Sequence, residues 1–186
     1  MSKILCFIHT DTNNLHKLNE DVTKKKLYTF ARMVRLNYEI GKIIDNKFIV
    51  DFKKSHIVKP RSMHIANDKI HGISQIIAEE NGIDPEIILN EFKDDIKKVD
   101  FIISHSIDFH LRTILAEALR FNIMIDFNKY VIIDTMSFFH NYNYIKLKEL
   151  AVKLSIKNKT PSKTDDNLKL IKKIFFELYN QYQSSL

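Results

Sequence analysis

Apolar runs separated by polar turns dominate the first third of the chain, and this pattern predicts strands. The run at 4–8 is apolar throughout and ends in a polar cluster, which indicates a buried strand that opens onto a polar edge. A partly alternating segment at 30–40 predicts a second strand. Asp45-Asn46 is a hairpin-turn signal, and the segment at 48–52 is then the returning third strand.

Helical spacing of apolar residues begins at about residue 65. Ser74 is suited to cap a helix that stops at Gly82, and Asp84-Pro85 is suited to open the next one. The other predicted elements are helices at 65–71, 107–121, 145–154 and about 166–180, and strands at 101–104 and 131–134.

The order of these elements predicts an α/β fold. Three strands come first, and helices then alternate with single strands, which is typical of a mixed sheet flanked by helices. No internal repeat and no shift in composition divides the sequence. We therefore expect a single domain over residues 1–186.

Composition narrows the class of protein. The only cysteine, Cys6, cannot form an internal disulfide, which indicates a reducing compartment. The apolar run near the N-terminus is too short for a signal peptide or a membrane span, so we expect a soluble protein of the cytoplasm or nucleus with no membrane partner. The net charge of +6 favours contact with polyanions.

Five blocks of sequence follow one another in the order and at the spacing of a known set of motifs. Together they resemble the DEDD superfamily of 3′–5′ exonucleases, in particular the DEDDh-like branch that contains the proofreading subunit of bacterial replicative polymerases. The resemblance covers about residues 4–178. The blocks are FIHTDTNNL at 7–15, HIVKPRSMHIANDKIHGIS at 56–74, IISHSIDFHLRTIL at 102–115, IDTMSFF at 133–139 with IKLKELAVKLSI at 145–156, and TDDNLKLIKKIF at 164–175.

The resemblance implies a ribonuclease-H-like fold, with a five-stranded mixed sheet and helices on both faces. It also implies a site in which four carboxylates hold two divalent metals, with a histidine as general base. Carried onto this chain, the four ligand positions are His9, Asp11, His110 and Asp166, and the general base falls on Pro161. Asp11 and Asp166 are thus the candidate catalytic carboxylates.

Two of the four expected anions are therefore neutral imidazoles. Such a set should bind Mg²⁺ poorly, because Mg²⁺ prefers anionic oxygen ligands. Imidazole suits Mn²⁺, Fe²⁺ or Zn²⁺ better, so the site is predicted either to take Mn²⁺ or another transition metal in preference to Mg²⁺, or to hold no metal. Asp108 cannot replace His110 if the segment is helical, because two residues differ by about 200° around a helix.

The resemblance also assigns a substrate edge. Thr12, Asn13, Asn14 and Leu15 correspond to the segment that receives the terminal nucleotide, and His105 is a further substrate-binding candidate. Packing near the site is the alternative role for His105.

Other residues are predicted to have structural roles. Asp134-Thr135 should cap the segment after a strand, His71 should cap or pack, and Phe109 should anchor the core. The lysine run Lys24–Lys26 is either a solvated face or a border of the substrate groove.

Three functions remain open on these grounds. The first is a divergent 3′–5′ exonuclease that uses a metal other than Mg²⁺. The second is an inactive pseudo-exonuclease that binds the 3′ ends of single-stranded DNA or RNA, or a polymerase or other protein partner. The third is an interaction domain that no longer binds nucleic acid, because fold alone does not fix function.

Overall fold

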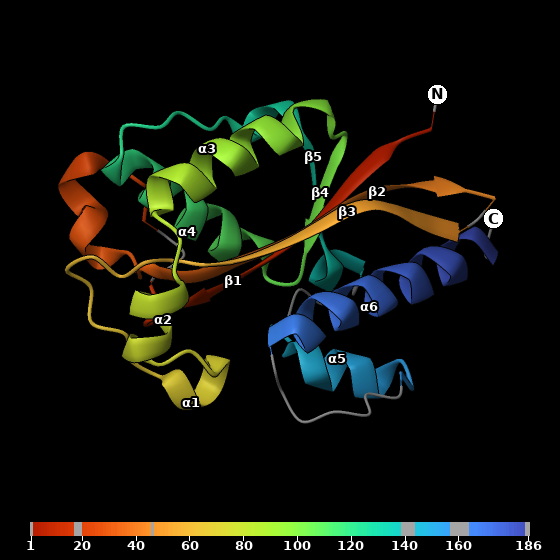
Figure 1. The fold of residues 1–186 in the computed structure, drawn as a ribbon. Coiled ribbons are helices and arrows are strands. Elements are labelled where there is room, and N and C mark those ends of the chain that lie inside the picture. The colour runs from red at the N-terminus through yellow and green to blue at the C-terminus, as the bar shows by residue number, and fades with distance from the viewer. Residues whose placement is uncertain (1, 17–19, 46, 139–143, 157–163, 185–186) are drawn as a thin grey trace.

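Five strands form one mixed sheet in the order β3-β2-β1-β4-β5 (Figure 1). The computed structural model describes residues 2–16, 20–45, 47–138, 144–156 and 164–184, without the side chains of 164–166 and 183–184. The strands are β1 (Ile4–Thr12), β2 (Met33–Ile44), β3 (Lys47–Ile57), β4 (Phe101–Ser104) and β5 (Val131–Asp134). β1, β2 and β3 pair in antiparallel fashion, whereas β4 runs parallel to β1 and β5 runs parallel to β4.

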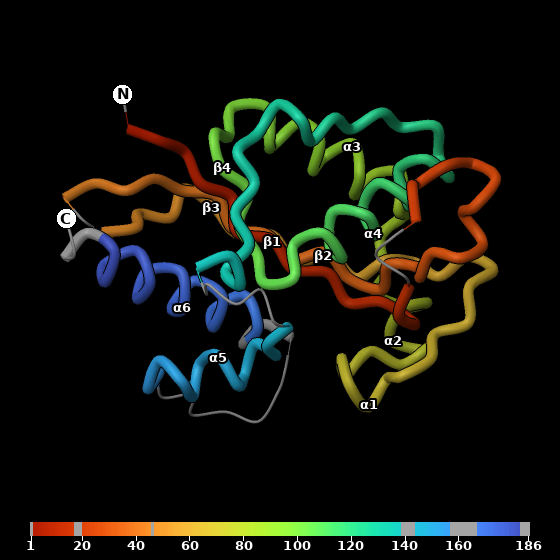
Figure 2. The backbone as a smooth tube through the Cα atoms, turned by 180° about the vertical axis from the view of Figure 1, so that it is seen from behind, coloured from red at the N-terminus to blue at the C-terminus, as the bar shows by residue number. Residues whose placement is uncertain are grey.

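Helices cover both faces of this sheet, so the predicted fold class is confirmed. The α-helices are α1 (Asp68–His71), α2 (Gln75–Asn81), α3 (Pro85–Asp95), α4 (Ile107–Arg120), α5 (Leu147–Lys153) and α6 (Thr164–Ser184). Four short 3-10 helices are η1 (Lys24–Thr29), η2 (Ile96–Lys98), η3 (Phe127–Lys129) and η4 (Thr135–Phe138). In Figure 1, α3 and α4 lie on one face and α6 on the other, with α5 outside α6. Figure 2 shows the start of β1 and the end of α6 beside the β2–β3 hairpin.

The alternation of side chains along β1 explains the two cores. Cys6 and Ile8 pack with α3 and α4, for example against Phe92. Leu5 and Phe7 point to the opposite face and pack against α6. Because successive side chains of a strand point to opposite faces, a central strand covered on both sides must be apolar at every position. This requirement accounts for the unbroken apolar run at the start of the chain.

The β2–β3 hairpin is longer than the sequence pattern predicted. β3 was expected over 48–52 but continues to Ile57, and its last residues pair with β2 as far as Arg35. Lys53, Lys54 and Ser55 interrupt the apolar pattern there. An edge strand with a solvent-facing side tolerates such residues, and charged side chains at an edge also discourage pairing with other chains.

Local capping signals correctly marked the starts of α2 and α3, whereas α1 begins at Asp68 and not at the predicted residue 65. The Ser74 hydroxyl accepts a hydrogen bond from the backbone N–H of Ile77 at 3.2 Å, and the Asp84 carboxylate accepts one from Glu86 at 2.9 Å. Gly72 ends α1 with a φ of 72°, in the left-handed region where glycine carries no steric penalty. None of the described helices combines the length and the apolar character needed to cross a bilayer.

Candidate functional site

The carboxyl ends of β4 and β5 hold the start of α4 in place. Ser106 precedes α4 with a φ of 55°, and its own side chain makes no capping hydrogen bond. The cap comes from β5, because the carboxylate of Asp134 accepts the backbone N–H groups of Ser106 at 3.0 Å and Ile107 at 2.8 Å. A carboxylate at this end of a helix also complements its dipole. Asp134 also has the predicted capping role in the segment after its own strand, where its Oδ1 accepts the Met136 N–H at 2.9 Å.

His105 joins three segments from a buried position. Its Nε2 lies 2.8 Å from the carbonyl oxygen of Ile145, which can only accept, so Nε2 carries a proton. Its Nδ1 lies 2.8 Å from the hydroxyl of Thr135. Burial lowers the pKa of His105, so the neutral ring accepts the Thr135 hydroxyl at Nδ1. Both ring nitrogens therefore have protein partners, and the predicted contact of His105 with substrate stays a prediction.

His110 lies on the buried face of α4, against the end of β1. Its Nδ1 lies 3.1 Å from the backbone nitrogen of Thr10 and 2.8 Å from the Thr10 hydroxyl. Burial, and then the nearby His9 and His105, hold the pKa of His110 well below its ordinary value. The ring is therefore neutral. Since a backbone N–H always donates, Nδ1 accepts and the single ring proton is on Nε2.

His9 and Asp11 lie on β1 and form a chain of polar contacts that ends in an arginine. His9 Nε2 is 3.5 Å from Asp11 Oδ1 and 3.2 Å from the side-chain amide nitrogen of Asn167. Asp11 Oδ2 is 3.3 Å from Nε of Arg35, which lies directly opposite Asp11 on β2. The side chains of Asp11 and Arg35 are only 10% and 15% exposed, so this is a nearly buried ion pair.

The structure brings three of the four predicted ligand positions together. The His9 and His110 rings meet edge to face with centroids 4.8 Å apart, and Asp11 lies beside His9. Asp108 points to solvent and pairs with Arg112 at 2.7 Å, as expected for a residue two positions from His110 on a helix. The side chain of Asp166, at the start of α6, and Pro161 lie outside the described part of the chain.

A pocket of about 790 Å³ opens at His9 and His110, and we call it the β1 pocket. His9, His105 and His110 line its floor. Such a position, outside the carboxyl ends of parallel strands, is where open α/β sheets bind ligands. Its rim carries Lys146 and Lys148 from the start of α5.

One wall of the β1 pocket is an aromatic stack that the sequence did not predict. His16 and Phe109 lie parallel, with ring centroids 4.4 Å apart and planes 8° apart. Phe109 was expected to anchor the core, but it is only partly buried and lines the pocket. Burial lowers the pKa of His16, which makes its ring a neutral partner in the stack.

The predicted substrate edge divides between two places. Leu15 is 80% exposed and lines the β1 pocket. Asn13 and Asn14 face a neighbouring pocket, where the Asn13 carboxamide oxygen accepts the Arg32 backbone N–H at 2.9 Å. The Thr12 hydroxyl donates to the Asn14 carbonyl at 2.6 Å, which shapes the turn after β1. Nucleotide contact by these four residues stays a prediction.

The ligand atoms of His9, Asp11 and His110, in their present contacts, do not fit a metal ion. Asp11 is paired with a guanidinium, and the available lone pair of His110 accepts a backbone N–H. A histidine ligand needs a free lone pair on one nitrogen and normally donates from the other. Within the described residues, no group of three or more His, Cys, Asp or Glu side chains is arranged to hold a metal. Ligation by His9, Asp11, His110 and Asp166 therefore remains a prediction without geometric support from the first three.

No protein-family model and no curated protein matches this chain. Solved nuclease structures do resemble its fold. A product-bound exonuclease I has a TM-score of 0.74 at 11% identity, over 97% of this chain and 44% of that chain. Escherichia coli exonuclease I with a dA16 oligonucleotide has a TM-score of 0.70 at 10% identity, over 96% and 41%. The nuclease domain of 3′hExo, a DEDDh family member bound to rAMP, has 0.71 at 13% identity, over 97% and 93%.

This chain thus spans 40% to 44% of exonuclease I chains but 93% of the 3′hExo nuclease domain. At identities between 10% and 13%, the likeness establishes the fold and not the chemistry. The five-stranded mixed sheet, its strand order and the helices on both faces accordingly give this chain the ribonuclease-H-like fold of the DEDDh exonucleases.

Proposed function

We propose that this chain acts at the 3′ ends of single-stranded nucleic acid and belongs functionally with the 3′–5′ exonucleases, in a form that binds the end without Mg²⁺-dependent turnover. The observation that carries the proposal is the β1 pocket, at the carboxyl ends of β1 and β4 in an exonuclease fold. Its volume of about 790 Å³ lies in the usual range for small-molecule sites and suits a nucleotide.

The lining of the β1 pocket supports recognition of a base and a phosphate. The His16–Phe109 stack presents a flat wall of the kind on which bases stack. Lys146 and Lys148 give the rim positive charge, and Glu149, whose carboxylate lies 3.9 Å from Lys146 Nζ, offsets part of it. Phosphate contact with lysine releases counterions and favours binding.

The same lining argues against the metal chemistry of the fold family. Two-metal hydrolysis requires anions that hold the ions, whereas the floor presents three imidazoles, and the Asp11 carboxylate beside His9 is already paired with Arg35. No catalytic step is therefore assigned to Asp11 or His110. Asp166 is the residue that could alter this proposal, since its side chain is the fourth member of the predicted set.

A labelled single strand with a free 3′ hydroxyl tests the proposal, as DNA and as RNA, with Mg²⁺, Mn²⁺ and Zn²⁺ supplied in turn. We expect binding in chelator, no shortening with Mg²⁺, and weaker binding when the 3′ end is blocked by a bulky group. In Phe109→Ala, binding should weaken by about 1–3 kcal/mol, or roughly 5- to 150-fold, the usual contribution of a base stack. Met124→Ala is the control, because it removes an exposed apolar side chain outside the pocket.

Two results would contradict the proposal. Rapid shortening with Mg²⁺ alone would show that the floor holds a metal pair after all. Absence of binding to DNA and RNA at low salt would remove the nucleic-acid function and favour a domain that contacts only proteins. Cleavage with Mn²⁺ that Asp166→Ala abolishes would instead select the divergent exonuclease.

A further inference from the structure

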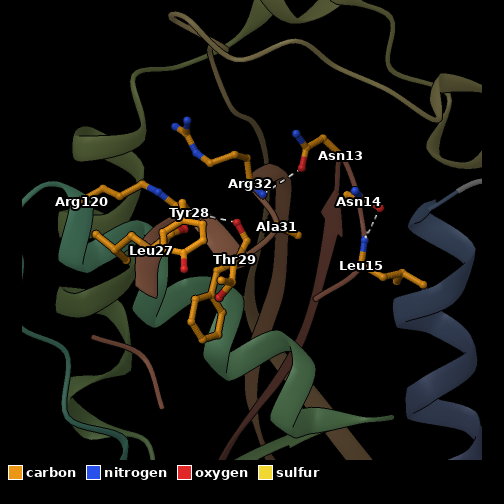
Figure 3. A pocket seen from close by; sticks show the side chains of 10 residues that line it. Asn13, Asn14, Leu15, Leu27, Tyr28, Thr29, Ala31, Arg32 and Arg120 are labelled. Atoms are coloured by element: carbon orange, nitrogen blue, oxygen red, sulfur yellow. Dashed lines mark hydrogen bonds between the residues drawn. The ribbon is translucent and has the colours of Figure 1, made fainter. Parts of the chain in front are cut away.

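A second pocket, of about 360 Å³, adjoins the β1 pocket, and Leu15 lines both. We call it the arginine pocket. In the view of Figure 3, Arg120 and Tyr28 lie on one side, Asn13, Asn14 and Leu15 on the other, and Arg32 between them. Residues 27–31 complete its lining.

Beneath this pocket, one buried carboxylate holds two arginines. The Glu117 side chain is only 1% exposed, and its Oε1 accepts from Arg32 Nε at 2.8 Å and from Arg120 Nη1 at 3.0 Å. The backbone N–H of Met33 donates to the same oxygen at 3.0 Å. Two positive charges against one negative charge leave a surplus of positive charge at the pocket.

The two arginines differ in how many of their N–H donors already have an acceptor within the protein. Arg120 uses Nη2 to donate to the carbonyls of Leu27 and Phe30, at 2.6 Å and 3.1 Å. Within the described part of the chain, neither terminal nitrogen of Arg32 has an acceptor, and its side chain is 27% exposed. Arg32 is thus anchored through Nε and presents two parallel donors, the geometry that suits a phosphate.

The surroundings of the arginine pocket favour an anion further. The exposed run Lys24–Lys26 lies in η1, the segment whose later residues line the pocket. The carboxylate of Glu20, which accepts the Thr29 hydroxyl at 2.8 Å, keeps its negative charge and offsets part of this attraction. Tyr28 is 86% exposed at the pocket and has a free aromatic face on which a base can stack.

We propose that the arginine pocket binds a backbone phosphate of the strand whose 3′ end occupies the β1 pocket, with Arg32 as the main contact and Tyr28 stacked on the attached base. This inference rests on the proposed function and extends it. The strand would pass over Leu15, which lies between the two pockets. The group that the arginine pocket would bind is a phosphate, either within a strand or as a free ion. Binding that depends on one position along the strand identifies an internal phosphate, because a free phosphate ion has no such position.

A series of single strands from two to eight nucleotides tests this site. Affinity should rise in a step once the strand reaches the arginine pocket. In Arg32→Gln, the step should shrink about tenfold, as expected for loss of charge-assisted hydrogen bonds, and the salt dependence should fall by about 0.7 in slope for one phosphate on a single strand. Binding of the dinucleotide should not change, which also shows that the variant is folded.

Arg61→Gln is the matched control, because it removes the same charge from an arginine that pairs with Asp84 outside the pocket. A strand with one neutral methylphosphonate linkage, moved position by position, locates the contact. We expect one position to weaken wild-type binding and to have no further effect in Arg32→Gln. Inorganic phosphate should compete with the long strands only at concentrations far above those of the strands.

The outcomes separate this inference from the proposed function. If wild type binds strands but the affinity step persists in Arg32→Gln, or the methylphosphonate effect is unchanged, the arginine pocket is not a strand site. Equal losses of affinity for the longer strands in Arg32→Gln and Arg61→Gln would mean that Arg32 acts only through its charge and not through a specific contact. That result would overturn the inference. If wild type binds no strand of any length, the proposed function fails first.

Discussion

The β1 pocket and the arginine pocket adjoin at Leu15, yet their charges are arranged in opposite ways. Next to the floor of the β1 pocket, the Asp11 carboxylate is paired with Arg35 inside the protein, and burial keeps His110 neutral. At the arginine pocket, Glu117 holds two arginines and neutralises the charge of only one. Both carboxylates are close to fully buried, so the difference lies in the number of cations around each.

This contrast separates shape from charge in the proposed binding of a strand. The floor of the β1 pocket can recognise a terminal nucleotide by stacking and fit, and attraction for a phosphate is left to the two lysines on its rim. A pocket with a surplus cation attracts a phosphate but recognises little else. We therefore expect 3′-end selectivity to come from the β1 pocket and most of the salt-dependent affinity to come from the arginine pocket.

The largest expected effect concerns the anion beneath the arginine pocket. Glu117→Ala leaves Arg32 and Arg120 without their counterion and the Met33 N–H without its acceptor. Breaking a buried ion pair on one side costs about 3–5 kcal/mol of folding free energy. Denaturant unfolding of wild type and variant measures the loss, with one common slope of unfolding free energy against denaturant concentration.

Asp108→Ala is the matched control for that loss. It breaks the pair with Arg112 on the same helix, but the Asp108 side chain is 54% exposed, so we expect about 0.5 kcal/mol or less. Similar losses for the two variants would mean that Glu117 does not organise the arginine pocket.

The next effect concerns protonation in the β1 pocket. Because the folded pKa of His110 is depressed, the unfolded chain binds the proton more readily, and stability falls as the pH drops below about 6.5. Each such histidine contributes up to about 1.4 kcal/mol per pH unit in that range. His110→Asn keeps an acceptor for the Thr10 N–H and should reduce the slope of stability against pH between about 6.5 and 5.

Unfolding curves at several pH values measure that slope. His64→Asn is the control, because His64 is exposed and loses little hydration on folding. An unchanged slope in His110→Asn would mean that the His110 ring binds a proton as readily in the folded protein as in the unfolded chain, and would reopen the assignment of its nitrogens. His105 and His16, whose pKa values burial also lowers, should retain part of the pH dependence.

Local signals in the sequence were sufficient for much of the fold. Ser74 and Asp84 mark helix starts through interactions within a few residues, so their roles could be predicted. The length of β3 could not, because its polar residues are tolerated only at the edge of the sheet. Edge position is a property of the strand order and not of the segment itself.

The candidate site was predicted only in part for a similar reason. Matching of motifs placed His9, Asp11 and His110 at one site, and the structure does bring them together. The partners that decide their chemistry come from elsewhere in the chain. Arg35 reaches Asp11 through the β1–β2 register, and Thr10 meets His110 across 100 positions of sequence. Such pairings follow from register and packing, which no local pattern encodes.

The smallest expected effect tests whether Arg35 acts as the internal counterion of Asp11. Arg35→Met should leave the Asp11 carboxylate without its guanidinium partner, so that a divalent ion gains a binding site that wild type lacks. A single weak site adds only about 0.4 kcal/mol of stability when free Mn²⁺ equals its dissociation constant, so thermal unfolding must be followed over a wide range of Mn²⁺ concentration. Asp11→Asn in the Arg35→Met background is the control and should remove the gain. Equal stabilisation of wild type and Arg35→Met by Mn²⁺ would show that the guanidinium does not exclude the metal, and the two pockets would then differ in shape rather than in charge balance.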